Sequence, residues 1–281
     1  MQRLTNSIYL ETGYLAPNVG CIMTEEGAVL VDSPFLPKDA LHWRKELNSI
    51  VGNKGISYLI NTHCHFDHVL GNSLLCSKII VQQHDLKGFY AYLDRNMLNA
   101  DIKMFFPEEF QQYKKELDKV DIILPQIVFF DRLDLYLGGQ IIQLISCGGH
   151  TRGSILIYIP SDKVLFCGDN VDNGVHPSMG AANFQAWLKL LQDVEQMDIQ
   201  YVVPGHGEVG DKALVKLMRE YFETMIQEVK GHKEAQIEPK VLVEKVKQHM
   251  LDYLPVKNKK ELEIEKYKLD VGINRIYRQI P

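Results

Sequence analysis

The chain has 281 residues, of which 46% are hydrophobic, and it carries a formal net charge of -5 at pH 7. This length and composition suffice for one domain with a substantial apolar core and an extension. The acidic balance excludes a global basic field that would attract nucleic acid or an anionic membrane, and no apolar run approaches the ~20 residues of a membrane span.

The amino terminus shows neither the basic nor the long apolar region of a secretory signal. The five cysteines form no CxxC pair, and their odd number suits a reducing compartment better than a disulfide framework. We therefore expect a cytoplasmic protein.

The first elements in chain order are a helix and a strand. Residues 37–50 place Leu41, Leu47 and Ile50 at helical spacing, which predicts an outer helix. A short run of β-branched and apolar residues at 56–60 then predicts a buried strand.

Three histidines and one aspartate follow that strand, at His63, His65, Asp67 and His68. Polar groups crowded in this way cost free energy unless they are partnered, and a divalent cation relieves that cost by accepting lone pairs from imidazole and carboxylate. The pattern therefore predicts a metal site on this loop. Alternation along an extended segment would point Cys64 away from its neighbours, as a small buried residue and not a ligand.

Residues 85–120 mix aromatic and charged side chains, which predicts helices with a surplus of apolar surface. We expect most of these side chains to pack on a sheet. Our hypothesis is that some of them, with Phe105 and Phe106 as the ones to test, roof the metal site and set substrate choice, because lids exclude water and position substrates.

Three further strands, predicted at 141–145, 164–167 and 201–203, each lead into a glycine-containing turn that carries one histidine or aspartate. These three candidate ligands are His150, Asp169 and His206. Glycine permits the tight turns, and loops at the ends of a rigid sheet commonly carry catalytic groups. A single histidine after a strand is more often merely hydrogen-bonded, but four such sites in one chain favour one shared metal centre.

The remaining elements are predicted helices. Residues 183–197 carry one apolar stripe with Asn183 as the N-cap, and residues 212–229 form an amphipathic helix whose apolar side includes Leu217. Breaks are expected at Gly231 and Pro239, and the apolar stripe of the charge-rich segment 234–281 comprises Val241, Val243, Val246 and Met250.

The ligand pattern resembles the metallo-β-lactamase superfamily from about residue 8 to residue 210: His-X-His-X-Asp-His, then Gly-His-Thr, then Gly-Asp after a strand, then Pro-Gly-His-Gly. Residues 18–22 and 29–33 also resemble the first two strands of that family. The resemblance implies an α/β fold, a four-layer αβ/βα sandwich of two mainly antiparallel sheets with helices outside and the metal site at one edge.

We expect a catalytic domain at residues 1–210 and a helical C-terminal extension at 211–281 that packs on the same domain. The residues alone leave open whether this extension only packs on the core, covers the metal site or forms a homodimer.

The resemblance also implies a ligand set. The first metal ion would be bound by His63, His65 and His150, the second by Asp67, His68 and His206, and Asp169 would bridge the two. We expect two divalent ions, with zinc as the first choice and iron or manganese as alternatives, because imidazole suits several of these metals.

The expected activity is that of a metal-dependent hydrolase. A divalent metal lowers the pKa of bound water from about 15.7 to near 7, and a hydroxide held between two ions can attack a polarised carbonyl or phosphoryl group. Asp67 and Asp169 are the expected catalytic residues, since they would orient this nucleophile and accept its proton. The expected partner is a small-molecule ester, thioester, lactone or lactam, with no nucleic acid and no membrane.

Two positions argue against particular branches of the family. Asp169 stands where the cysteine-containing β-lactamases hold Cys, and Asp172 stands where quorum-signal lactonases usually hold Tyr. A mononuclear iron oxidoreductase that resembles persulfide dioxygenases is one alternative, and a non-catalytic metal-binding protein is another. His176, in the loop after Asp169, is a lesser candidate for substrate contact.

Overall fold

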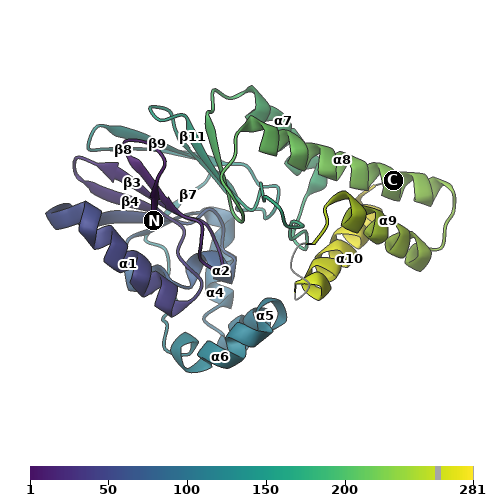
Figure 1. The fold of residues 1–281 in the computed structure, drawn as a ribbon, viewed down its shortest axis with the longest axis horizontal. Coiled ribbons are helices and arrows are strands. Elements are labelled where there is room, and N and C mark those ends of the chain that lie inside the picture. The colour runs from purple at the N-terminus through teal and green to yellow at the C-terminus, as the bar shows by residue number, and fades with distance from the viewer. Residues whose placement is uncertain (257–260, 281) are drawn as a thin grey trace.

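The computed structural model describes residues 1–256 and 261–280, and two β-sheets lie at its centre (Figure 1). The first sheet has the strands in chain order: β1 (Gln2–Arg3), β2 (Ile8–Glu11), β3 (Val19–Thr24), β4 (Gly27–Val31), β5 (Ile56–Ile60), β6 (Ile79–Gln82) and β7 (Ile127–Phe129). The second has the order β12 (Tyr201–Pro204), β11 (Val164–Gly168), β10 (Ile155–Ile159), β9 (Gln140–Ser146) and β8 (Arg132–Leu137).

Helices cover the outer face of each sheet. The first sheet carries α1 (Pro37–Val51), η1 (Gly52–Lys54), α2 (Phe66–Val69), α3 (Asn72–Leu75), η2 (Gln83–Asp85), α4 (Leu86–Ala91), α5 (Arg95–Phe105) and α6 (Pro107–Leu117). The second carries α7 (Phe184–Gln196), α8 (Lys212–Glu234), α9 (Pro239–Tyr253) and α10 (Leu262–Gln279).

The two sheets face each other across an apolar layer. Ile22 and Val29 of the first sheet and Leu144 and Ile157 of the second are fully buried in this one cluster. Separate apolar clusters join each sheet to its helices. Three buried layers between four layers of secondary structure confirm the predicted αβ/βα sandwich.

The strand directions differ in part from the expectation of mainly antiparallel sheets. In the first sheet β4, β5, β6 and β7 run parallel to one another, whereas β4 pairs with β3 in the antiparallel sense. A parallel pair needs a crossover connection, and α1 provides it between β4 and β5. Only one pair of the second sheet, β11 with β12, is parallel.

This parallel pairing is what assembles a site. The carboxyl ends of β4, β5 and β6 lie at one edge of the first sheet because the three strands run the same way. In the second sheet β9 and β11 are both antiparallel to β10 and therefore share a direction, which β12 also has. The loops that leave these strands consequently meet at one end of the sandwich.

Several side chains expected on apolar stripes are in fact exposed. Leu41 of α1 is 53% exposed, Leu217 of α8 57% and Val241 of α9 45%. The face that α9 buries is set by Leu242, Val246 and Met250, which recur every four residues and contact the cluster under the second sheet.

Two of the expected helix boundaries have different outcomes. Pro239 begins α9 at its first turn, where the missing N–H is tolerated. Gly231 does not break α8, which continues to Glu234. The N-cap prediction for α7 is confirmed, because the Asn183 side chain accepts a hydrogen bond from the Ala186 N–H.

Across the described ranges, none of the helices has both the length and the hydropathy that crossing a bilayer requires.

Two leucines of α1 test which face of the helix carries the packing energy. Leu47 is fully buried and Leu41 is half exposed. We expect Leu47→Ala to lower the free energy of unfolding by about 2–5 kcal/mol, because it leaves a cavity, and Leu41→Ala to change it by less than about 0.5 kcal/mol. Urea unfolding of both variants measures this, and equal losses would contradict the assigned face.

Candidate metal centre

The structure brings the seven predicted side chains together at the end of the sandwich described above. His63 and His65 lie on the loop that leaves β5, and Asp67 and His68 lie on the short helix α2 that follows. The others come from the second sheet, after β9, β11 and β12: His150, Asp169 and His206.

Three imidazole nitrogens face one another in the first group. The Nδ1 atom of His65 lies 3.0 Å from Nε2 of His63 and 2.9 Å from Nε2 of His150. A proton shared by two of these nitrogens would satisfy only one of the two contacts. In a tetrahedral zinc site with Zn–N bonds of about 2.0–2.1 Å the ligand atoms lie about 3.3 Å apart, so one cation fits among all three.

A second group lies beside the first. The Asp67 Oδ2 atom is 3.7 Å from Nε2 of His68 and 3.4 Å from Nε2 of His206. These three ligand atoms also lie within 4.8 Å of one another, as those of the first group do together with Asp169.

Asp169 lies between the two groups with one oxygen toward each. Its Oδ2 atom is 3.7 Å from Nε2 of His63 and 3.6 Å from Nε2 of His150. Its Oδ1 atom is 3.0 Å from Nε2 of His68 and 3.5 Å from Nε2 of His206. This is the arrangement that a carboxylate bridging two cations requires.

The ring nitrogens that face away from the cluster have partners of their own. Nδ1 of His63 is 3.2 Å from the Thr62 hydroxyl, and Nδ1 of His150 is 2.8 Å from the carbonyl oxygen of Ser178. Nδ1 of His68 is 2.9 Å from a carboxylate oxygen of Asp32. Such contacts select the tautomer and leave each Nε2 lone pair free for a metal.

Asp32 is a central support that the sequence patterns did not single out as functional. Its carboxylate accepts hydrogen bonds from the backbone N–H and the hydroxyl of Thr62 as well as contacting His68. It has a φ of 56°, in a region that residues other than glycine rarely adopt. Strain of this kind persists only where surrounding contacts hold the backbone, here at the end of β4.

Burial decides the charge of the first group. Removal from water lowers the pKa of all three imidazoles. The pKa of His65 is lowered, that of His63 lies well below its usual range, and that of His150 falls to about 3. These imidazoles are therefore neutral near pH 7, with lone pairs available to a cation.

In the second group, nearby carboxylates outweigh burial and favour protonated histidines. Burial opposes protonation of His68 and His206, but Asp169 and its neighbouring carboxylates raise the pKa of His68 well above 6.5 and that of His206 to about 10. Burial likewise works against the ionised form of Asp169, yet His68 and His206 hold its pKa well below the usual range. Without a metal, protons on these two histidines balance the buried carboxylates.

Two buried atoms have needs that a cation would satisfy. Nε2 of His68 and Oδ1 of Asp169 lack a hydrogen-bonding partner of good geometry within the part of the chain that the structure describes. Buried polar atoms of this kind are rare because desolvation without a partner costs free energy. The nitrogen-and-carboxylate donor set therefore fits divalent cations.

Solvent reaches part of each group. The side chain of His206 is 24% exposed and that of Asp67 is 12%, and His65 is half-buried, whereas His63 and Asp169 are almost completely buried. Access is therefore on the side of His65, Asp67 and His206.

Two further carboxylates lie near the cluster. Asp172, three residues after Asp169, is buried and can share a cation with Asp169 and His206. Asp85 follows β6, and the Cys64 thiol and the Thr151 hydroxyl hydrogen-bond to it. Both occupy strand-end positions like those of the predicted ligands, and this signal was available in the sequence.

Cys64 points away from the predicted ligands, as expected from alternation, and an added Cβ at Gly88 would overlap its sulfur. His176 is 1% exposed, and its Nδ1 atom lies 2.8 Å from the Tyr221 hydroxyl on α8. The ring is thus turned into the helical layer, which argues against a substrate contact by this lesser candidate.

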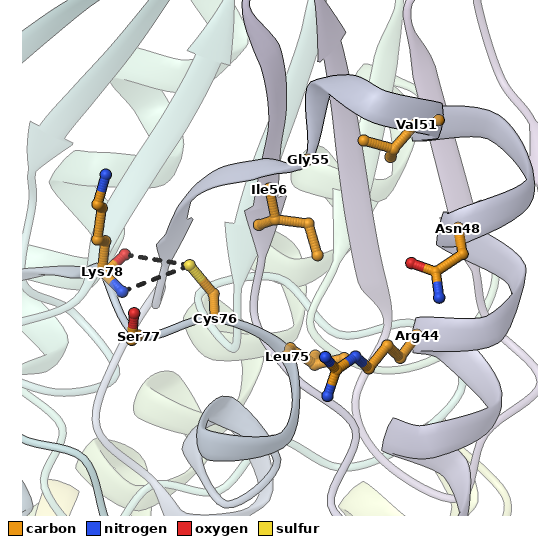
Figure 2. A pocket seen from close by; sticks show the side chains of 10 residues that line it. Arg44, Asn48, Val51, Gly55, Ile56, Leu75, Cys76, Ser77 and Lys78 are labelled. Carbon is orange, nitrogen blue, oxygen red and sulfur yellow. Dashed lines mark hydrogen bonds between the residues drawn. The ribbon is translucent and has the colours of Figure 1, made fainter.

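A groove lined by Arg44, Lys78 and the chain around Gly55 lies elsewhere (Figure 2). It borders the start of β5, whereas the cluster follows the end of that strand. The groove therefore has no part in the candidate site.

Comparison with known proteins gives one family model, described as the metallo-beta-lactamase superfamily, which matches residues 12–206. The metallo-beta-lactamase type 2 of Bacteroides fragilis is 31% identical over 111 residues, which are 36% of this chain and 45% of that enzyme. The enzyme of the same name from Pseudomonas aeruginosa is 24% identical over 247 residues, 84% of this chain and 86% of that one.

A solved structure is similar over almost the whole chain. The stereoselective inverting sec-alkylsulfatase Pisa1 from Pseudomonas sp. has a TM-score of 0.71 at 15% identity, covering 99% of this chain and 49% of that one. At this identity the likeness shows the fold. The present chain spans about half the length of that protein.

Asp85 should make stability depend on pH. Burial raises the pKa of its carboxyl from 3.8 to about 7. Between pH 3.8 and about pH 7 the Asp85 carboxyl is therefore ionised in the unfolded chain and protonated in the folded chain. Stability from this group is fully present below about pH 4 and is lost as pH rises to about 7. The wild type should therefore lose at most about 3 kcal/mol of unfolding free energy through this group between pH 4.5 and pH 8, and we expect Asp85→Asn to abolish that loss.

Urea unfolding with a chelator present, at both pH values, measures this difference. Asp118→Asn is the control, because the Asp118 carboxylate is exposed and forms an ion pair with Lys114 on the surface. Parallel pH profiles for the wild type and Asp85→Asn would contradict the prediction.

Proposed function

The chain belongs to the metallo-β-lactamase superfamily and is a metallo-hydrolase, and we propose that it holds two divalent metal ions, in the first instance zinc, to hydrolyse a small-molecule ester, thioester, lactone or lactam. The proposed ligands of one ion are His63, His65 and His150. Those of the other are Asp67, His68 and His206, with Asp169 shared.

The observation that carries the proposal is the position of Asp169. Each of its oxygens faces one group of imidazoles, at 3.6–3.7 Å on one side and 3.0–3.5 Å on the other. A structural site for a single ion would need no carboxylate whose two oxygens face different groups of imidazoles. A polar cluster without metal would leave several nitrogen and oxygen lone pairs pointing at one another.

Bound divalent ions would lower the pKa of a water molecule to near 7 and polarise the scissile bond. The chain's own residues orient the reaction. The Asp67 carboxylate lies on the exposed side of the cluster, 3.4 Å from His206, so we propose that it orients the attacking water and accepts its proton. The contacts of the Nδ1 atoms with the Thr62 hydroxyl, the Ser178 carbonyl and the Asp32 carboxylate keep the imidazole rings fixed while charge develops.

Metal analysis combined with a substrate panel tests this function. Protein purified without added metal should carry divalent metal, and chelation should abolish hydrolysis of at least one panel member while zinc restores it. The panel contains an ester, a thioester, a lactone and a β-lactam, the last because of the named relatives, and a secondary alkyl sulfate because of the similar structure.

Two variants make the same experiment specific. His150→Ala should lose the metal of the first group and reduce kcat/KM at least about 100-fold, because an incomplete ligand set no longer holds the ion. Asp169→Asn should disturb both ions. His42→Ala, on the exposed face of α1, is the control. Full metal content and activity in either site variant, or oxygen uptake on glutathione persulfide without any hydrolysis, would contradict the proposal.

The insertion supplies a candidate contact for the substrate. Phe105 at the end of α5 lies 6.3 Å from the ring of Phe66, which stands between two proposed ligands, and 6.3 Å from the ring of Tyr267 on α10. The Phe106 ring also lies near Phe66, at 6.0 Å, but it packs more closely on Phe35, at 4.8 Å. The contact with Tyr267 of α10 makes Phe105 the residue to test first.

We expect Phe105→Ala to lower kcat/KM for a bulky apolar substrate on the order of tenfold relative to a small one, with metal content unchanged, because an apolar contact is lost. Met104→Ala, a half-exposed neighbour, is the control. An unchanged substrate ratio in the Phe105 variant would rule out the lid role.

A further inference from the structure

Side chains of the helix α10 hydrogen-bond to both ends of the segment of residues 176–182. At one end the Glu265 carboxylate accepts a hydrogen bond from the His176 N–H at 2.7 Å, and Lys268 Nζ donates to the His176 carbonyl at 3.2 Å. Glu265 is itself buried and paired with Lys268 at 2.7 Å. This buried ion pair therefore holds the start of the segment on the helix.

The other end of the segment is held by a second set of side chains, nearer the C-terminus of α10. Arg275 donates through Nε to the Ala182 carbonyl and through Nη1 to the Gly180 carbonyl, the latter at 2.7 Å. The Gln279 amide donates to the same Ala182 carbonyl at 2.9 Å. These bonds satisfy backbone acceptors of a segment that lies in no strand or helix.

The middle of the segment rests directly on the helix backbone. Met179 is buried against Gly272, where an added Cβ would lie 3.1 Å from the Met179 Cβ and closer still to its sulfur and methyl group. Glycine at this position lets the segment approach more closely than any other residue would allow. The segment is thus fixed at three points by one helix.

Ser178, between these points, makes the contact that matters for the site. Its carbonyl oxygen lies 2.8 Å from Nδ1 of His150, so it accepts the proton of that nitrogen. The Nε2 atom of His150 then faces His65 and Asp169 without a proton. The position of one carbonyl, held by α10, sets the tautomer and orientation of a proposed ligand.

We propose that α10 is a positioning element for the metal centre, in which Arg275, Gly272 and Glu265 hold the Ser178 carbonyl against His150 and thereby raise the affinity of the first group for its ion. This inference rests on the proposed function, in which His150 is a metal ligand. It gives the C-terminal extension a role in the site although no residue of α10 is among the proposed ligands.

Zinc affinity of the full-length protein tests the proposal. The metal-free protein is titrated with zinc in competition with a chromophoric chelator. We expect Arg275→Ala and Gly272→Val each to weaken zinc binding by the first group, which contains His150, about 10–100-fold. This is the usual consequence of losing a support behind a metal-bound histidine. Asn274→Ala is the matched control, because this neighbour is exposed and its amide donates to the Asp270 carbonyl within α10.

A second readout separates positioning from loss of stability. In ¹⁵N–¹H spectra of the imidazoles, the hydrogen-bonded Nδ1–H proton of His150 should shift or exchange faster in Arg275→Ala and in Gly272→Val and stay unchanged in Asn274→Ala. Arg275→Lys, which can still reach one carbonyl, should recover part of the zinc affinity. Circular dichroism establishes that each variant is folded.

The outcomes distinguish this inference from the one on which it rests. If the wild type binds no zinc, the proposed function fails. If the wild type binds zinc and both folded variants bind it equally well, with an unchanged His150 proton, the role of α10 is refuted. If Arg275→Ala does not fold, Gly272→Val and Gln279→Ala decide the matter by the same two measurements.

Discussion

The structure depends on one buried electrostatic arrangement, the Asp169 carboxylate placed between two groups of imidazoles. A carboxylate so deeply removed from water is tolerable only beside positive charge. Protons on His68 and His206 supply that charge when no metal is bound, and divalent ions would supply it otherwise. The same demand explains why the proposed ligands are clustered and why hydrogen bonds fix the imidazole rings from behind.

The sandwich serves this arrangement by bringing strand ends to one place. Parallel neighbours in the first sheet and equal directions of β9, β11 and β12 in the second direct all the relevant loops to one edge. The apolar layer between the sheets lies apart from the site and contains no ligand. A polar cluster that would destabilise a core is thereby held by a scaffold whose stability comes from separate contacts.

Supports behind the cluster come from strand ends of the first sheet and from the C-terminal helix α10. Asp32 ends β4, Asp85 follows β6, and Ser178 is held by α10. Each fixes a loop or a ring by hydrogen bonds to groups far away in the chain. The C-terminal helix α10 thus contributes to the geometry of the site as well as to packing.

The sequence by itself determined the elements and chemistry that are encoded locally. Strand-turn-ligand patterns identified the seven clustered side chains, and helical spacing identified α1, α7 and α8, because such signals depend only on neighbouring residues. It did not identify the supporting role of Asp32, the parallel strands or the exposed sides of Leu41 and Leu217. These were decided by tertiary structure, since strand direction, helix rotation and the partners of a buried carboxylate are set by contacts between segments far apart in the chain. The positioning of Ser178 by α10 also depends on tertiary structure. Glycine, arginine and glutamate on a polar helix can support this carbonyl only when residues 176–182 are packed against them.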